Sequence, residues 1–483
     1  MMLSRSQPLT CIVASNSIAG AQDSCSLLTS VMDASVLWRV ERLQLEHAFA
    51  VPDFEVTDNV LPDVYPLATQ VLTGEEEAAN ITELFFSVRL DLIYASGRPM
   101  PKLRSLHLEN VRRPPNLMTW ARTLNVLVMV CVIGIDGSAF LDALMAMDFL
   151  TVLEIDSVAF RAEDLGDRVE EDSVRLLRLE RLTLHLEVDD MAALLCMLDT
   201  PRLRYMFLTE HRGIRPFEMP PGDNPPGLTR GPEEIVNATI AILRRTCCTR
   251  IDLGPDLRFQ RDIAHSSSHD LVPESFVRIA SHDSRRARFA AFMRGISLAL
   301  LYEPGLLTSV HSLHLNASSP FTMSSVEWSD VLNELEGVRS LEIVGRSANM
   351  CDILLALRST NEYGAVLPSM RRITLVPVDL SVAVADAIVE LVRSRSTESS
   401  SAEALSECIV FKDWFLLNVA DEREEAYRIL AELDTAVPIT FRARERSVVL
   451  ALEEVEAVQD GDGSFHDTFD VLAGHGASSA AAL

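Results

Sequence analysis

The stretch Leu103-Arg104-Ser105-Leu106-His107-Leu108 carries the pattern that decides the fold. Its apolar residues follow the spacing L-x-x-L-x-L. Side chains two positions apart on a strand point to the same face, so Leu106 and Leu108 face one core. Leu103 lies three residues before Leu106, where the chain enters the strand. One such unit cannot bury its apolar face alone, so the pattern predicts that neighbouring units stack around a continuous core.

The same spacing returns along the chain, and the repetition makes it informative. Successive copies in the first half begin roughly two dozen residues apart, near the period of a leucine-rich repeat. Unrelated amphipathic strands in an ordinary α/β domain are the alternative interpretation. The copies, given by their three apolar residues, are Val40/Leu43/Leu45, Ile81/Leu84/Phe86, Leu103/Leu106/Leu108, Leu124/Leu127/Met129, Leu150/Leu153/Ile155, Leu179/Leu182/Leu184, Leu203/Met206/Leu208, Cys248/Ile251/Leu253, Val310/Leu313/Leu315, Val338/Leu341/Ile343, Met370/Ile373/Leu375 and Leu405/Cys408/Val410.

Between the copies, the apolar period changes from that of a strand to that of a helix. Residues 138–147 and 190–198 have apolar side chains at helical spacing, and Ser138 is the expected N-cap of the first helix. The repeating unit is therefore strand, loop, helix, loop. We predict an α/β leucine-rich-repeat solenoid, with a curved parallel β-sheet on the concave face and helices on the convex face.

Breaks in this rhythm divide the chain into five segments. We expect a weakly ordered lead-in or the remnant of a capping element over 1–35, regular leucine-rich repeats over 36–208, irregular repeats with two long loop inserts over 209–309, longer leucine-rich repeats and a closing element over 310–457, and a disordered tail over 458–483. Further helices are expected over 232–246, 287–302, 327–335, 350–357, 382–392 and 421–433.

Charge and composition limit the function classes. The net charge of −27 over 483 residues argues against nucleic-acid binding, which needs clustered Lys and Arg. The most apolar run, 124–135, is shorter than the roughly 20 residues that cross a bilayer. The 8 cysteines are scattered without a C-x-x-C pair, as in a reduced compartment. We expect an intracellular protein, cytoplasmic or nuclear, that binds neither membrane nor nucleic acid and is monomeric outside complexes.

The sequence contains none of the searched motifs for nucleophilic catalysis, phosphate binding, zinc hydrolysis or calcium binding. His265 and His269 would share one face of a helix, but three serines between them favour a solvated loop over a metal site. No cofactor, metal or catalytic residue is therefore expected. The alternative is an enzyme whose site lies in the 209–309 inserts, because long loops in a compact protein are often functional.

The residues between and after the strand leucines are expected to line the concave face. They are polar, mixed in sign and rich in acids, which favours a protein-binding face; ordinary solvation of an exposed sheet is the alternative. The candidates are His107, Glu109, Glu154, Asp156, Thr183, His185, His314, Asn316, Glu342 and Thr374.

Residues 100–111, with the helix-then-strand steps at 141–155 and 194–204, resemble the leucine-rich regions of fungal F-box proteins. The resemblance covers roughly residues 36–415 as a style of repeat. It implies a substrate-recognition subunit of a cullin ubiquitin ligase, with the ligase adaptor and a protein substrate as partners. In that family an N-terminal helical segment opening with Leu-Pro-x-Glu docks on the adaptor, and 1–35 contain no such signature. A leucine-rich binding protein unrelated to ubiquitination is the further alternative.

Overall fold

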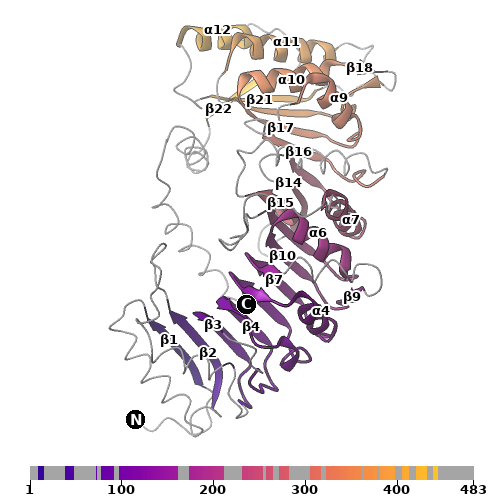
Figure 1. Cartoon of the computed structure of the whole chain (residues 1–483). Coiled ribbons are helices and arrows are strands. Elements are labelled where there is room, and N and C mark those ends of the chain that lie inside the picture. Colours follow the sequence, from indigo (N-terminus) through magenta and orange to yellow (C-terminus); the bar gives the residue numbers. More distant parts are fainter. Residues whose placement is uncertain are drawn as a thin grey trace, which may run out of the picture.

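The computed structural model has an α/β fold, in which one mostly parallel β-sheet follows the chain from end to end (Figure 1). Figure 1 shows the sheet bent into an arc, with helices along the outer side. The described part contains an 18-stranded sheet and seven α-helices. The structure describes residues 9–15, 39–47, 72, 78–91, 97–160, 173–210, 231–253, 257–264, 271–281, 305–316, 323–361, 364–377, 380–396, 405–412, 420–431 and 439–443.

Strand pairing gives the order of the sheet. The strands are β1 Leu9–Ser15, β2 Val40–His47, β3 Glu83–Asp91, β4 Ser105–Arg112, β5 Val126–Val130, β6 Ile133–Ile135, β7 Val152–Asp156, β8 Ala159–Phe160, β10 Arg181–Leu186, β12 Tyr205–Glu210, β13 Arg250–Leu253, β14 Leu257–Ala264, β15 Leu271–Ser281, β16 Ser312–Asn316, β17 Ser340–Gly345, β20 Arg372–Pro377, β21 Glu407–Lys412 and β22 Ile439–Ala443. Sixteen of them follow the order β1-β2-β3-β4-β5-β7-β10-β12-β15-β14-β13-β16-β17-β20-β21-β22. The short strand β6 pairs with β4, and β8 pairs with β6. Within this order only β14 runs antiparallel to its neighbours.

The register aligns the repeats residue by residue. The middle apolar residue of each copy pairs with the middle residue of the next strand, so one row crosses the whole sheet. The row is Cys11, Leu43, Leu84, Leu106, Leu127, Leu153, Leu182, Met206, Val277, Phe259, Ile251, Leu313, Leu341, Ile373, Cys408 and Ile439.

Burial confirms the predicted core. All three apolar residues of every copy are at most 4% exposed, from Val40 at one end to Val410 at the other. A strand that buries one face must keep its register, because a one-residue slip would move every leucine to the solvent side. Each copy therefore fixes the position of its neighbours, and the core is continuous along the arc.

The helices lie in the gaps between strands, as the periodicity predicted. Their bounds are α4 Gly137–Met145, α6 Val188–Met197, α7 Gly231–Leu243, α9 Ser325–Asn333, α10 Ser347–Arg358, α11 Val382–Ser396 and α12 Ala420–Ala431. The predicted N-cap of α4 was wrong. Asp136 caps this helix, since its side chain accepts a 3.0 Å hydrogen bond from the Ala139 amide, and Ser138 lies inside the first turn.

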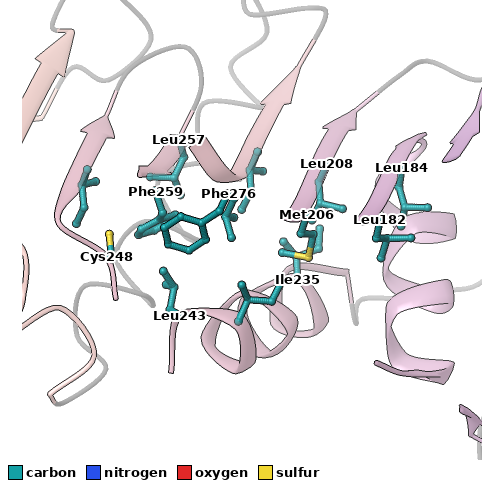
Figure 2. Close-up of a cluster of buried hydrophobic side chains, with 14 of the residues drawn as sticks. Leu182, Leu184, Met206, Leu208, Ile235, Leu243, Cys248, Leu257, Phe259 and Phe276 are labelled. Atoms are coloured by element: carbon teal, nitrogen blue, oxygen red, sulfur yellow. The ribbon is translucent and has the colours of Figure 1, made fainter. Parts of the chain in front are cut away.

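The second expected insert also needs correction. The second of the two loop inserts expected within 209–309 was predicted to be irregular, but there the hairpin strands β14 and β15 fill the space between β12 and β13 in the sheet. Figure 2 shows why they are stable there: the rings of Phe259 and Phe276 lie side by side in the core, above Ile235 and Leu243 of α7. Both rings are at most 1% exposed.

The first expected segment contains regular structure too. Residues 9–15 of the lead-in form β1, which pairs in parallel with β2 and so extends the sheet beyond the first copy. No helix of the described part is long and apolar enough to cross a membrane. The loop expected at 265–270, the helix expected at 287–302, residues 211–230 and the tail at 458–483 lie outside the described residues.

Candidate protein-binding face

The concave face consists of the strand side chains that alternate with the buried leucines. All ten candidate residues lie on strands, at positions that point away from the core. The register divides them into two groups. In the first group, Glu154 and Asp156 of β7 pair in register with Thr183 and His185 of β10. His107 and Glu109 belong to the same group and lie on β4, two strands away from β7. The other lies on β16, β17 and β20, where Glu342 is next to both His314 and Thr374, and Asn316 ends β16.

A hydrogen-bonded pair lies at the centre of the first group. Nδ1 of His185 is 3.1 Å from Oδ2 of Asp156, and the hydroxyl of Ser157 donates to the other carboxylate oxygen at 2.8 Å. The side chains of Asp156 and His185 are each 26% exposed. Both carboxylate oxygens of Asp156 thus have partners, which holds the pair in a fixed geometry on the face.

Two left-handed residues shape the end of these strands. Cys131 has φ 52° and directly follows the last residue of β5, and Ser157 has φ 51° and directly follows the last residue of β7. Their amides donate to the next repeat, Cys131 to the Asp156 carbonyl at 2.8 Å and Ser157 to the His185 carbonyl at 2.9 Å. Burial, and then the charges of Asp156 and Glu109, raise the pKa of the Cys131 thiol. The thiol therefore stays protonated near neutral pH, which makes it a poor nucleophile.

An apolar strip adjoins this pair on β3, β4 and β5. The concave positions of β5 are all valine, and Val128 pairs in register with His107. The His107 ring packs against Phe85 with a centroid distance of 4.2 Å. Burial lowers the pKa of His107 to about 4, and its Nε2 is buried without a hydrogen-bond partner. His107 is therefore a neutral, largely apolar part of the face.

Thr183 differs from the expectation of an exposed residue. It is only 6% exposed, and its hydroxyl is buried without a hydrogen-bond partner. Its neighbours in the row, Glu154 and Phe207, are longer side chains on the flanking strands β7 and β12. A short residue between two longer ones is covered by them, so Thr183 contributes little contact surface.

The second group is held by residues that the sequence analysis did not select. Asp252 of β13 accepts 2.9 Å hydrogen bonds from Arg250 and Gln260, and its Oδ1 lies 3.7 Å from Nδ1 of His314. Gln260 comes from the antiparallel strand β14, and its amide nitrogen also lies 3.2 Å from the Ser275 hydroxyl. The alternation of apolar and polar residues in Leu257-Arg258-Phe259 is the sequence signal of β14, which the irregular insert expected there did not include.

Arginine side chains contact the aromatic rings of β12, a strand that lies between the two groups. The guanidinium of Arg181 lies 5.4 Å from the centroid of Phe207. Arg261 donates to the Tyr205 hydroxyl at 3.0 Å and lies 5.7 Å from the centroid of that ring. These contacts hold the rings of Tyr205 and Phe207, which are two positions apart on one face of β12.

Among the described residues, no group of three or more His, Cys, Asp or Glu side chains could hold a metal ion. A hollow of about 760 Å³ is lined by Thr151, Leu177, Arg178, Glu180, Pro201 and Arg202, away from the Asp156–His185 pair. Comparisons with protein-family models and with curated proteins found no match.

Proposed function

We propose that this chain is a non-enzymatic protein-interaction scaffold, built as a leucine-rich-repeat solenoid, and that it binds a partner protein on its concave face. The observation that carries the proposal is a continuous row of paired residues between the leucines. The row runs from Ile12 of β1 to Thr440 of β22 over sixteen paired strands. Solenoids of this kind use such extended concave surfaces for binding.

The composition of the face supports a protein as the ligand. It combines an apolar strip at Val128 and Phe85 with ordered polar groups such as Asp156–His185. An apolar centre with surrounding polar groups is the usual anatomy of a protein–protein interface. The enzyme alternative places its site within 209–309, where the structure describes hydrogen bonds from Arg250 and Gln260 to Asp252.

An F-box-like role as a substrate-recognition subunit of a cullin ubiquitin ligase is the more specific form of this proposal. It rests on the resemblance of residues 100–111 and the repeats around them. Capture of the cullin-ligase adaptor by the purified full-length chain tests it. Without adaptor binding, the concave face would serve a scaffold unrelated to ubiquitination.

A matched pair of substitutions tests the scaffold proposal. Val128→Lys places a charge in the apolar strip, whereas Val326→Lys makes the same change at a 69% exposed position on α9. Full-length wild type and Val326→Lys should retain the same partner from a cell extract, and Val128→Lys should lose it. The melting temperatures of the three proteins control for folding. Equal retention by all three folded proteins would refute binding on this face.

A further inference from the structure

Two glutamates flank the apolar strip on the concave face. In the register of the sheet, Glu109 of β4 is next to Val130, and Glu154 of β7 is next to Val128. Both glutamate side chains are half-buried. Neither has a hydrogen bond or an ion pair with any residue that the structure describes. We call Glu109 and Glu154 the flanking glutamates.

The charged groups around them do not neutralise this negative charge within the described part of the chain. A third carboxylate, Asp156, lies beyond the strip, and its charge is the one that faces His185 at 3.1 Å. His107 is neutral, because burial lowers its pKa to about 4. Arg181 packs over an aromatic ring of β12. The arginines at 112 and 113 are exposed at the end of β4.

Two further groups respond to this arrangement. The pKa of the Cys131 thiol is raised by burial and then by the charges of Asp156 and Glu109, as expected beside carboxylates that keep their charge. Thr183 pairs in register with Glu154 on the concave face, is 6% exposed, and has a hydroxyl oxygen without a hydrogen-bond partner. Buried polar groups nearly always have partners, so this hydroxyl marks a position that a ligand can complete.

Covering the apolar strip has a consequence for the flanking glutamates. A partner that packs on Val128 and Val130 also removes water from the glutamates on either side. Burying a carboxylate without a counter-charge is strongly unfavourable, whereas a paired and hydrogen-bonded carboxylate is tolerated. The partner must therefore bring cations to both sides of its apolar contact.

We propose that the apolar strip binds a segment of the partner protein in which one apolar side chain lies between two cationic ones. The cations contact Glu109 and Glu154, and the apolar side chain contacts Val128 and Val130. This inference rests on the proposed function and names the chemistry of the ligand. The net charge of −27 favours the approach of such a basic segment and disfavours nucleic acid and anionic membranes.

Strand geometry gives the spacing of the segment. Neighbouring strands are about 4.8 Å apart and alternate residues about 7 Å apart, so the flanking glutamates are separated by about 12 Å. In an extended segment every second side chain points the same way, and the first, third and fifth span about 14 Å. The matching pattern is cation, apolar residue and cation at alternate positions, with the long cationic side chains adjusting for the difference.

A defined peptide tests this inference with the full-length protein. The probe is a short fluorescein-labelled peptide with Arg at its first and fifth positions, Leu at its third and Ser between them. Binding is measured by fluorescence anisotropy at physiological salt, and the control peptide has Gln in place of both arginines. Glu109→Gln/Glu154→Gln should weaken binding of the basic probe about tenfold or more. Glu334→Gln/Glu336→Gln removes the same charge from exposed positions after α9 and should leave binding unchanged.

Each outcome decides the assignment. Binding of the basic probe to wild type that is lost in Glu109→Gln/Glu154→Gln alone supports it, provided that the melting temperatures of all variants agree. No binding, equal binding of the control peptide, or equal loss in both double variants overturns it.

Two other occupants of the strip would also overturn the inference. Probe binding that requires Arg285→Gln/Arg286→Gln/Arg288→Gln would assign the flanking glutamates to this chain's own basic run. Self-association of the wild type that Glu109→Gln/Glu154→Gln abolishes would assign the strip to a second copy. If the probe fails while Val128→Lys still abolishes partner capture, only this inference fails and the proposed function stands.

Discussion

The guanidinium of Arg395 donates a 3.1 Å hydrogen bond to the carbonyl oxygen of Leu367, a residue with left-handed backbone at φ 48°. The same side chain also donates to the carbonyls of Val366 and Leu357, and it is 3% exposed. Burial lowers the pKa of Arg395 to about 10, so the group remains charged at neutral pH. One arginine on α11 thus satisfies a carbonyl in the last turn of α10 and two carbonyls in the connection to β20.

Replacing this arginine should destabilise the C-terminal repeats. Arg395→Leu leaves three carbonyl oxygens without their donor, and we expect the free energy of unfolding to fall by about 3 kcal/mol. Urea denaturation followed by tryptophan fluorescence measures it, since Trp328 is buried in α9 of the same region. Arg393→Leu, at an exposed position two residues earlier, should change the value by less than about 0.5 kcal/mol. Equal effects of the two substitutions would contradict the structural role of Arg395.

His107 should make the fold sensitive to mild acid. Its folded-state pKa of about 4 lies below the ordinary 6.5, so the unfolded chain takes up the proton more readily. The stability that His107 contributes is therefore fully present above pH 6.5 and is lost as the pH falls toward 4. Melting temperatures across this range should fall more for wild type than for His107→Phe. The exposed histidine variant His311→Phe should behave as wild type, and a parallel fall in all three would refute the prediction.

Two adjacent cysteines should differ in reactivity. Cys247 is exposed, whereas burial raises the pKa of Cys248 to about 12. Burial likewise raises the pKa of Cys408 to about 12. Iodoacetamide at pH 8 should therefore modify Cys247 and the exposed Cys196 in the folded protein, and Cys248 and Cys408 only after unfolding. Mass spectrometry of the digested protein assigns each site, and early labelling of Cys248 in the folded protein would be inconsistent with its burial.

Removing an aromatic ring from the hairpin should destabilise the centre of the sheet. Phe259→Ala deletes a ring that is 1% exposed, and we expect a loss of about 4 kcal/mol. Phe207→Ala removes the same ring from the half-buried concave position and should cost far less. Urea denaturation compares the two. A smaller effect at Phe259 than at Phe207 would mean that the hairpin is not part of the core.

The strands of the repeats could be predicted because the same spacing of three apolar residues recurs in each copy of the pattern. The register aligns Leu106 with Leu84 and Leu127, and Leu108 with Phe86 and Met129, so each copy supports the assignment of its neighbours. The hairpin has no counterpart. Its strands β14 and β15 are antiparallel, and a bulge near Phe259 and Gln260 shifts their register, which disrupts strict alternation.

The candidate site was predictable only in part for the same reason. Positions on the concave face follow from the strand pattern, and the ten candidates lie there. Which of them touch one another depends on the curvature and on side-chain length. The pairing of Asp156 with His185 spans 29 residues, and the burial of Thr183 depends on two flanking strands. Gln260 of the hairpin donates to Asp252, and this contact depends on the hairpin strands, so it could not be found from the repeats.

Photo-crosslinking tests the central claim most directly, because it reports which face of the chain contacts the partner. The photoreactive residue p-benzoylphenylalanine replaces Phe85 on the concave side in one full-length protein. In the other it replaces Leu355, a 44% exposed position on α10. Binding on the concave face predicts partner crosslinks from position 85 and not from position 355. Crosslinks from 355 alone would contradict the account and assign the interaction to the helical side.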